Sequence, residues 1–385
     1  MKIYCIIKKV INVINTLKID EIYEAEVIGL ENEGKGVCKV GGIIVFVPKT
    51  LKGEKIRFRI TEIKKNFAKG KLVQVLKESD KRVKPSCPYY EECGGCNLRH
   101  QEMKENLKFK KEKIENALKR IGKIDKKVED VIPSFKNDNY RNKISLKVED
   151  DKIGFYGEGT YQLIDIYSLS QDDVGIINYL TSNISNLKTV IFNDKVLFGT
   201  GYIKEISNGL MFNCSSKSFF QVNGMQAEKM YEEAIKLAKL KKDDVVLDLY
   251  CGTGTIGMIL SSHVKKVIGV EIVEDAIINA RENLRINDIN NESFICGDAS
   301  KVVSKIKEKI DVLFVDPPRA GVDRKAVAII KKMMPRKIVY ISCNPVTMAR
   351  DLSYLNDMYD IKKIVPFDMF PNTSHVECVC VLERR

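Results

Sequence analysis

The chain of 385 residues has no long hydrophobic run, no internal repeat and no low-complexity tract. A membrane-spanning helix needs about 18 or more consecutive apolar residues, and no stretch comes close to that length. Lys8 and Lys9 interrupt the apolar residues near the N-terminus, so we expect no signal peptide there. We therefore predict a cytoplasmic protein without a membrane anchor, in which residues 1–17 form an irregular or weakly amphipathic extension.

The sequence also lacks the even cysteine pattern of a secreted disulfide scaffold. Its eleven cysteines are an odd number, scattered along a chain long enough to bury a full core without disulfides. This pattern indicates a reducing compartment. Hydrophobic residues at 44% and charged residues at 30% are typical of a globular protein and exclude a wholly disordered chain. The length predicts two or three domains.

The net charge of +12 is concentrated in the front part of the chain. Residues 49–84 hold thirteen Lys and Arg against four acidic residues, and residues 99–127 hold eleven against five. The rest is close to neutral. Such a division suits a partner with a phosphate backbone, but a solvated lysine-rich surface gives the same counts. Charge alone leaves both interpretations open.

Short segments of alternating polarity, separated by glycines, predict five β-strands in residues 20–76. Five strands in so short a region favour a small closed barrel of the OB type, a common oligonucleotide-binding scaffold. We assign this barrel to residues 18–78. A mixed α+β domain with a cysteine loop is expected at 79–224, including a basic helix from about 101 to 121 that ends at Gly122.

In residues 225–385, strands and helices alternate, which predicts an α/β domain with a doubly wound parallel sheet. Gly252 and Gly254 follow an apolar strand and open a helix, where they allow a tight turn and the close approach of a ligand. Glu271 ends the next strand, where its carboxylate can bond ribose hydroxyls. Asp316 begins an Asp-Pro-Pro-Arg sequence at a further strand end. This sequence is of no particular use to a dehydrogenase and favours a methyltransferase that uses S-adenosylmethionine (SAM) on a nucleobase.

Two reactive side chains lie in the same half of the chain. An isolated cysteine is most often a small buried hydrophobe, but Cys343 directly follows an apolar strand, and Asn344-Pro345 forces a turn that presents its thiol in the ligand crevice. His375 and Glu377 alternate along the last strand, so their side chains share a face. Partial burial can raise the pKa of a glutamate into the range of a useful general base.

Three cysteines, Cys87, Cys93 and Cys96, have the spacing C-x5-C-x2-C, with two glycines that permit a tight wrap. Such clustering indicates a metal site. Zinc and iron–sulfur clusters both accept thiolate ligands, and the spacing does not choose between them.

Five motifs, in this order, resemble those of the RNA (uracil-5-)-methyltransferase family. They are SFFQVN (218–223), DLYCGTGTIG (248–257), DPPRAG (316–321), YISCNPVT (340–347) and FDMFPNTSHVE (367–377). The N-terminal barrel resembles the TRAM domain of the ribosomal RNA members, and the similarity covers nearly everything from about residue 18. Asn372 departs from the family, which usually has Gln, His or Tyr there; we expect little consequence.

The resemblance implies SAM-dependent methylation of uracil C5 in RNA by a SAM-dependent methyltransferase (Rossmann-like) domain. Cys343 would be the nucleophile and Glu377 the base. Four further residues would hold SAM, namely Gln221, Tyr250, Glu271 and Asp316. Because C5 of uracil is a poor nucleophile, chemistry independently supports addition of a thiolate at C6 before methyl transfer. A target uridine in folded RNA must also be flipped out to reach the pocket.

The barrel and the cysteine loop favour 23S ribosomal RNA as the substrate, because the better-known transfer-RNA members of the family lack both. Transfer RNA is the alternative substrate. A non-catalytic RNA-binding or assembly factor is a second alternative, against which the intact Cys343 and Glu377 argue. We expect a monomer that binds RNA and no membrane.

In the resembling family, the cysteine loop and a distant fourth cysteine hold a [4Fe-4S] cluster. Leu169 occupies the position where the resemblance places that fourth cysteine. A cluster would then need an outside ligand, or Cys38 or Cys214 in its place; otherwise it is lost or labile. We predict a [4Fe-4S] cluster on the three cysteines of the loop.

Overall fold

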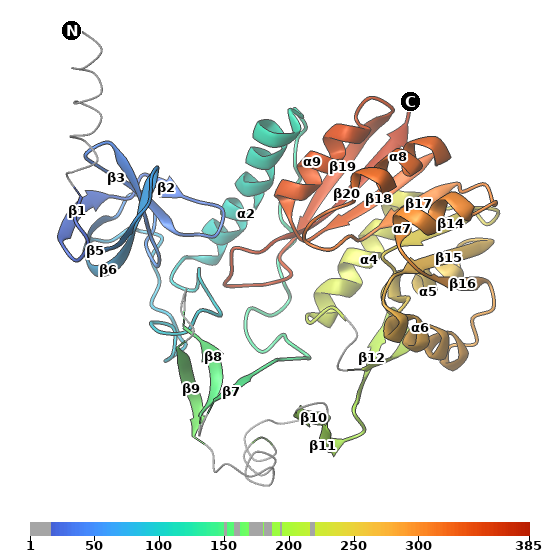
Figure 1. Ribbon diagram of the computed structural model, residues 1–385, viewed down its shortest axis with the longest axis horizontal. Helices are drawn as coiled ribbons and strands as arrows, with labels where there is room; N and C mark the ends of the chain where they lie inside the picture. The colour runs from blue at the N-terminus through green and yellow to red at the C-terminus, as the bar shows by residue number, and fades with distance from the viewer. Residues whose placement is uncertain are drawn as a thin grey trace. The chain divides into compact units, whose positions relative to one another are not determined.

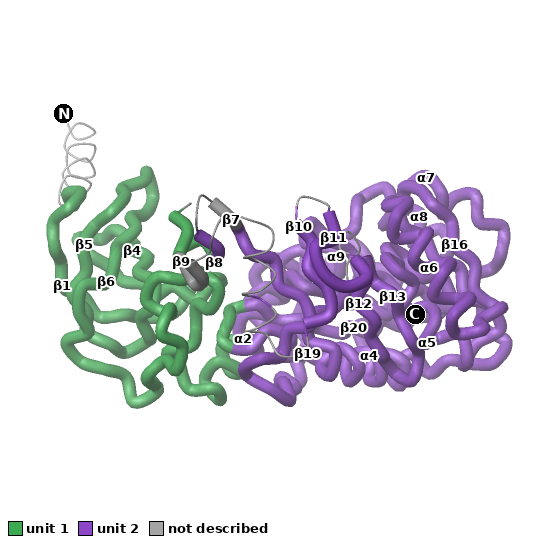
Figure 2. Tube along the Cα trace, turned by 90° about the horizontal axis from the view of Figure 1, so that it is seen from below, with its two compact units in different colours: residues 1–109, 154–166, 372–374 green, residues 110–153, 167–371, 375–385 purple. Residues whose placement is uncertain are grey.

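The computed structural model describes residues 17–149, 152–157, 162–168, 180, 187–192, 195–215 and 220–385. The chain divides into two compact units (Figure 2). Unit 1 comprises residues 1–109, 154–166 and 372–374, and unit 2 comprises residues 110–153, 167–371 and 375–385. Among the described residues, no helix combines the length and apolar character of a membrane span. The division into three domains at 18–78, 79–224 and 225–385 stays a prediction.

Unit 1 contains a sheet of six strands in the order β1-β5-β6-β4-β3-β2. The strands are β1 (Ile22–Glu26), β2 (Gly29–Leu30), β3 (Gly36–Val40), β4 (Ile43–Val47), β5 (Lys55–Ile63) and β6 (Phe67–Lys77). Alternate residues point inward, so that Ile56, Phe58 and Ile60 of β5 are fully buried in the core.

The sheet has one strand more than predicted, because the first expected strand bends and becomes β1 and β2. Val27 exchanges backbone hydrogen bonds with the turn before β5, whereas the N–H of Ile28 donates to Val37 of β3 at 2.8 Å. The chain thus changes partner between these two residues. Since β1 and β2 are the two edges of the sheet, this bent segment closes the predicted barrel.

The predicted basic helix is present as α2 (Met103–Ala117), which continues as the π-helical turn η1 (Leu118–Gly122). A Cβ atom at Gly122 would lie 2.8 Å from the carbonyl oxygen of Ala349, so only glycine permits this close packing. Short strands follow: β7 (Lys147–Glu149), β8 (Lys152–Tyr156), β9 (Leu163–Ser168), β10 (Thr189–Phe192), β11 (Lys195–Gly199), β12 (Tyr202–Ser207) and β13 (Leu210–Ser215).

The C-terminal part of unit 2 is a seven-stranded sheet in the order β16-β15-β14-β17-β18-β20-β19 (Figure 1). Its strands are β14 (Val245–Leu249), β15 (Lys266–Glu271), β16 (Glu292–Cys296), β17 (Val312–Val315), β18 (Lys337–Ser342), β19 (Tyr359–Phe367) and β20 (Glu377–Arg384). The first five in this order run parallel, and β20 is antiparallel to both of its neighbours.

Helices cover both faces of this sheet, which confirms the predicted doubly wound α/β fold. They are α4 (Gly224–Ala238), α5 (Thr255–Ser261), α6 (Glu274–Ile286), α7 (Ala299–Val302), the short 3-10 helix η2 (Val303–Lys305), α8 (Arg324–Met333) and α9 (Pro345–Leu355). The core on one face includes α8 and α9, and the core on the other includes α4 and α5. The parallel strands therefore present their carboxyl ends along one edge.

Candidate active site

The loop between β14 and α5 lies at this edge. Its backbone is left-handed at Tyr250, Gly252 and Gly254, with φ angles of 63°, 54° and 78°. A Cβ atom at Gly252 would meet nothing within 4 Å, so open space borders this glycine. The N–H of Gly252 donates to Glu271 Oε2 at 3.2 Å, which holds the carboxylate at the end of β15 against the loop. This arrangement suits a ligand that carries ribose hydroxyls.

Two more of the predicted SAM residues, Gln221 and Asp316, carry polar groups that could bind a ligand. The side chain of Gln221 is buried, and its Oε1 accepts no hydrogen bond from the described residues. A buried acceptor in this condition is expected to receive a donor from a bound ligand. Asp316 directly follows β17, and burial raises the pKa of its carboxyl group to about 7. Together with the glycine loop, these donors and acceptors fit SAM.

The strand register brings Cys343 and Glu377 together. The last paired residues of β18 and β20 are Ser342 and Cys378, so Cys343 and Glu377 are the next residues opposite each other. Asn344 then caps α9, since its Oδ1 accepts the N–H of Val346 at 3.1 Å. The chain thus passes from β18 into α9 directly after Cys343.

Burial, and after it the charges of neighbouring carboxyl groups and one arginine, set the pKa values of this pair. Burial raises the pKa of Glu377 well above its ordinary value, and Asp316 raises it further. Burial likewise raises the pKa of the Cys343 thiol to about 11, with contributions from Glu377 and Asp316. The guanidinium of Arg319 opposes both shifts. Burial, and then Arg319, lower the pKa of His375 to about 4, so its imidazole is neutral at pH 7.

The raised pKa of Cys343 predicts slow alkylation of the free protein. A thiol with a pKa of about 11 is protonated at neutral pH, and the thiolate is the nucleophile. We expect the rate of modification by iodoacetamide to rise about tenfold for each pH unit between 7 and 10. Mass spectrometry of the peptide that contains Cys343 measures this rate. A plateau at pH 8 would contradict the predicted pKa.

Sequence reasoning missed three residues of this site. Arg319 lies next to the prolines and looks like a surface arginine, and only the structure shows that its charge reaches Cys343, Glu377 and His375. Tyr231 has the helical spacing of a core residue in α4, yet its hydroxyl interacts with Asp316 and Glu377. Asp248 was noted in the sequence only as the first residue of the motif DLYCGTGTIG, with no role assigned to it. It is fully buried, and burial raises its pKa to about 8.

The three predicted metal ligands lie in one loop of unit 1 and are half-buried. Burial raises the pKa of the Cys93 thiol, and Cys96 and Cys87 also raise it. Nevertheless, the described residues contain no group of three or more Cys, His, Asp or Glu placed to hold a metal ion. The predicted iron–sulfur site is therefore not supported.

Neither proposed substitute completes a cluster site. Cys38 is fully buried in the barrel core, and Cys214 is buried in the core of unit 2 beside Phe212. Leu169 lies outside the described residues. Hydrogen bonds from a lysine side chain also hold the cysteine loop. Lys49 Nζ donates to the carbonyl oxygen of Tyr90 at 2.8 Å and to that of Glu91. The residues present do not fit a four-ligand cluster.

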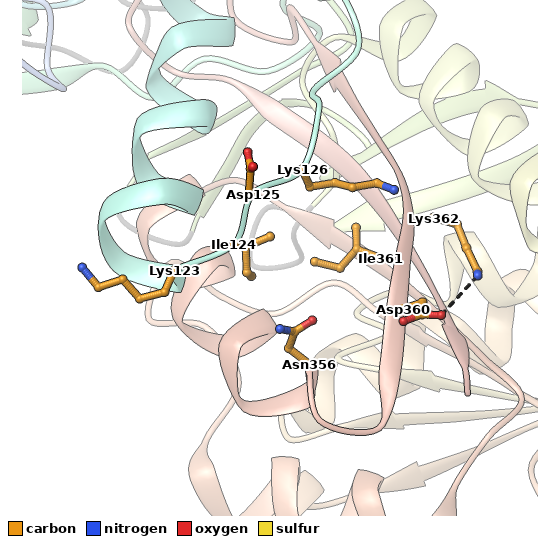
Figure 3. A pocket seen from close by; sticks show the side chains of 8 residues that line it. All are labelled: Lys123, Ile124, Asp125, Lys126, Asn356, Asp360, Ile361 and Lys362. Carbon is orange, nitrogen blue, oxygen red and sulfur yellow. Dashed lines mark hydrogen bonds and ion pairs between the residues drawn. The ribbon is translucent and has the colours of Figure 1, made fainter.

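A separate pocket of about 340 Å³ lies at the far end of β19 (Figure 3). Ile124 and Ile361 line it, and Lys362 pairs with Asp360 across 3.5 Å. Asp360 is seven residues from Phe367, which pairs with Glu377. At about 3.3 Å per residue, the two ends of the strand are roughly 20 Å apart. This pocket is therefore not part of the candidate active site.

The sheet order, the glycine loop and the strand-end carboxylates define the class of protein: the fold is that of the Rossmann-like methyltransferases. Residues 183–385 match the family model for tRNA (uracil-5-)-methyltransferase, and residues 17–73 match the TRAM domain. The chain therefore belongs to the RNA (uracil-5-)-methyltransferase family, as the motifs predicted.

Individual relatives support this assignment. Two proteins described as uncharacterized RNA methyltransferases, from Clostridium tetani and Clostridium acetobutylicum, are 34% and 35% identical to this chain. The alignments cover 95% and 94% of this chain and 97% of each relative. The crystal structure of Pyrococcus abyssi tRNA (uracil-54, C5)-methyltransferase in complex with S-adenosyl-L-homocysteine has a TM-score of 0.73 and 27% identity. The match covers 93% of this chain and 99% of the Pyrococcus abyssi chain.

Proposed function

We propose that this protein methylates C5 of uracil in RNA through a covalent bond between Cys343 and C6 of the base. The single observation that carries the proposal is the register of β18 and β20, which places a thiol opposite a buried carboxyl group. Family membership supplies the reaction class, and the side chains present suit its steps.

Each step has a residue in the site. The Cys343 thiolate adds to C6 of a flipped-out uracil, and electron density moves to C5. SAM, when bound, would supply the methyl group to C5, with its sulfur–methyl bond breaking to leave S-adenosyl-L-homocysteine. Glu377, in its ionised form, then removes the C5 proton, and the C6–sulfur bond breaks to release the thiolate. Arg319 favours the ionised forms of both groups, because its positive charge lowers both pKa values.

We assign the binding of SAM to Gln221, Tyr250, Glu271 and Asp316. Glu271 is held by the N–H of Gly252, and we propose that its carboxylate binds the ribose. The unpartnered Oε1 of Gln221 and the half-buried carboxyl group of Asp316 remain to accept donors from the rest of the molecule. Isothermal titration with S-adenosyl-L-homocysteine tests this assignment, since Gln221→Ala should weaken binding.

We propose 23S ribosomal RNA as the substrate, with transfer RNA as the second candidate. The barrel and the cysteine loop support ribosomal RNA. The Pyrococcus abyssi structure, which is that of a tRNA (uracil-54, C5)-methyltransferase, nevertheless covers 93% of this chain, which favours the alternative. Mapping 5-methyluridine in both RNAs from a strain without the gene tests the proposal. Loss of a ribosomal site supports it, and loss confined to transfer RNA overturns it.

The [4Fe-4S] cluster stays a prediction from the family resemblance, and no step above depends on it. If an outside ligand completes the three-cysteine site, we expect about four iron and four sulfide ions per chain after anaerobic purification. Elemental analysis and acid-labile sulfide assays measure both. Values near zero would show that Cys87, Cys93 and Cys96 form a metal-free loop.

A further inference from the structure

The segment between β19 and β20 leads directly to Glu377, and residues far away in the sequence hold it. It begins after Phe367 and comprises residues 368–376. Its first residues belong to unit 2, whereas residues 372–374 belong to unit 1. Each part has its own set of hydrogen bonds to the N-terminal third of the chain.

In unit 2, a buried ion pair fixes the start of the segment. Lys110 Nζ bonds to the carboxylate of Asp368 and also donates to the carbonyl oxygen of Phe370 at 3.0 Å. The side chains of Lys110 and Asp368 are only 1% and 4% exposed. Burial lowers the pKa of Lys110, while Asp368 opposes this shift. Removing one partner of such a pair would leave an uncompensated buried charge, which is strongly destabilising. The ion pair therefore holds the backbone at the start of the segment in place.

In unit 1, the cysteine loop holds the second part of the segment. The N–H of Ser374 donates to Asn97 Oδ1 at 2.8 Å, and Asn97 Nδ2 donates to Ser374 Oγ at 3.0 Å. The N–H of Leu98 donates to the carbonyl oxygen of Asn372 at 3.0 Å. Asn97 Nδ2 also bonds to the carbonyl oxygen of Glu33 in the barrel. One amide side chain thus bonds both the backbone and the side chain of Ser374.

The backbone of Asn372 is left-handed, with a φ of 63°. Asparagine adopts this conformation more readily than most residues with a side chain. Its departure from the family therefore suits the turn that presents its carbonyl oxygen to Leu98.

We propose that Asn97 is a positioning residue for the general base. It fixes Ser374, which is three residues before Glu377, and so limits where the carboxyl group lies relative to the C5 proton. The proposal rests on the proposed role of Glu377. A displacement of about 1 Å at a reacting group can reduce a rate about a hundredfold. The cysteine loop thereby serves catalysis through an amide, independently of any metal.

The test separates the step that needs the base from the steps that do not. RNA with 5-fluorouridine cannot lose a C5 proton, so its covalent adduct reports thiol addition and methyl transfer alone. Tritium release from RNA with 5-tritiated uridine reports removal of the C5 proton. We expect Asn97→Ala to form the adduct at nearly the wild-type rate but to release tritium about ten- to a hundredfold more slowly in a single turnover.

Two further variants keep the test decisive. Asn66→Ala removes an exposed asparagine of the same unit and should match the wild type in both assays. Ser374→Ala retains the backbone bond to Asn97 and loses only the Oγ acceptor, so a smaller delay in tritium release is expected. If Asn97→Ala does not fold, Ser374→Ala alone decides.

Equal losses in both assays would show a purely structural role for Asn97 and overturn the proposal, as would wild-type rates in both. The proposed function fails separately, if the wild-type protein forms no adduct through Cys343 or if Glu377→Gln releases tritium normally. If Asn97→Ala releases tritium at the wild-type rate while Glu377→Gln does not, only the positioning role of Asn97 is refuted.

Discussion

Cys343→Ala is expected to bind S-adenosyl-L-homocysteine and RNA but to form no covalent adduct with RNA that contains 5-fluorouridine. Cys343 follows β18, which β14 and β17 separate from the strand that ends at Glu271, so we expect cofactor binding without its sulfur. Without a nucleophile, electron density does not develop at C5 of uracil. We expect turnover to fall by about 10⁴-fold or more, which methyl transfer from labelled SAM measures.

Cys296→Ala is the matched control, because Cys296 is an exposed free thiol at the end of β16. It should form the adduct at the wild-type rate. Denaturing gel electrophoresis detects the complex as a shifted band. An adduct in Cys343→Ala would identify another cysteine as the nucleophile and remove the central step of the mechanism.

The sequence was sufficient to predict the α/β fold and the barrel, since strand and helix periodicities are local features. It did not predict that Val27 and Ile28 bond to different parts of the barrel, because this change of partner depends on contacts with β3 and with the turn before β5, which lie later in the chain. The extra strand and the closure of the barrel both follow from it. Comparison with known proteins confirms the family, which the resemblance of the five motifs had predicted.

The candidate site was predictable only where its residues end strands. Cys343 and Asp316 follow apolar strands, so their placement at the sheet edge could be inferred. That β20 inserts between β18 and β19, and so brings Glu377 opposite Cys343, is a tertiary pairing without a local signal. Lys110 shows the same limit. A lysine in a basic helix is expected to be exposed, yet Lys110 is buried against Asp368, which is 258 residues away in the sequence.

Glu377→Gln is expected to accumulate the methylated covalent complex with ordinary uridine RNA. Glutamine matches the neutral glutamic acid in size, and burial, followed by Asp316, raises the pKa of Glu377, so the free protein tolerates a neutral group there. Thiol addition and methyl transfer do not need the base. Elimination does, so release of product should slow by about 10²- to 10⁴-fold. Trapping the complex on a denaturing gel, with label from SAM, measures this.

The pH dependence distinguishes a base from a merely polar side chain. A base acts in its ionised form, and a raised pKa means that Glu377 ionises at a higher pH than an ordinary glutamate does. Tritium release by the wild-type protein should therefore increase with pH, whereas release by Glu377→Gln should lack this dependence. Glu383→Gln, near the other end of β20, is the control and should behave as the wild type. Normal turnover of Glu377→Gln, or an unchanged pH profile, would exclude Glu377 as the base and leave the removal of the C5 proton to another group. Asp316 is then the carboxyl candidate, because its charge interacts with both Glu377 and Cys343.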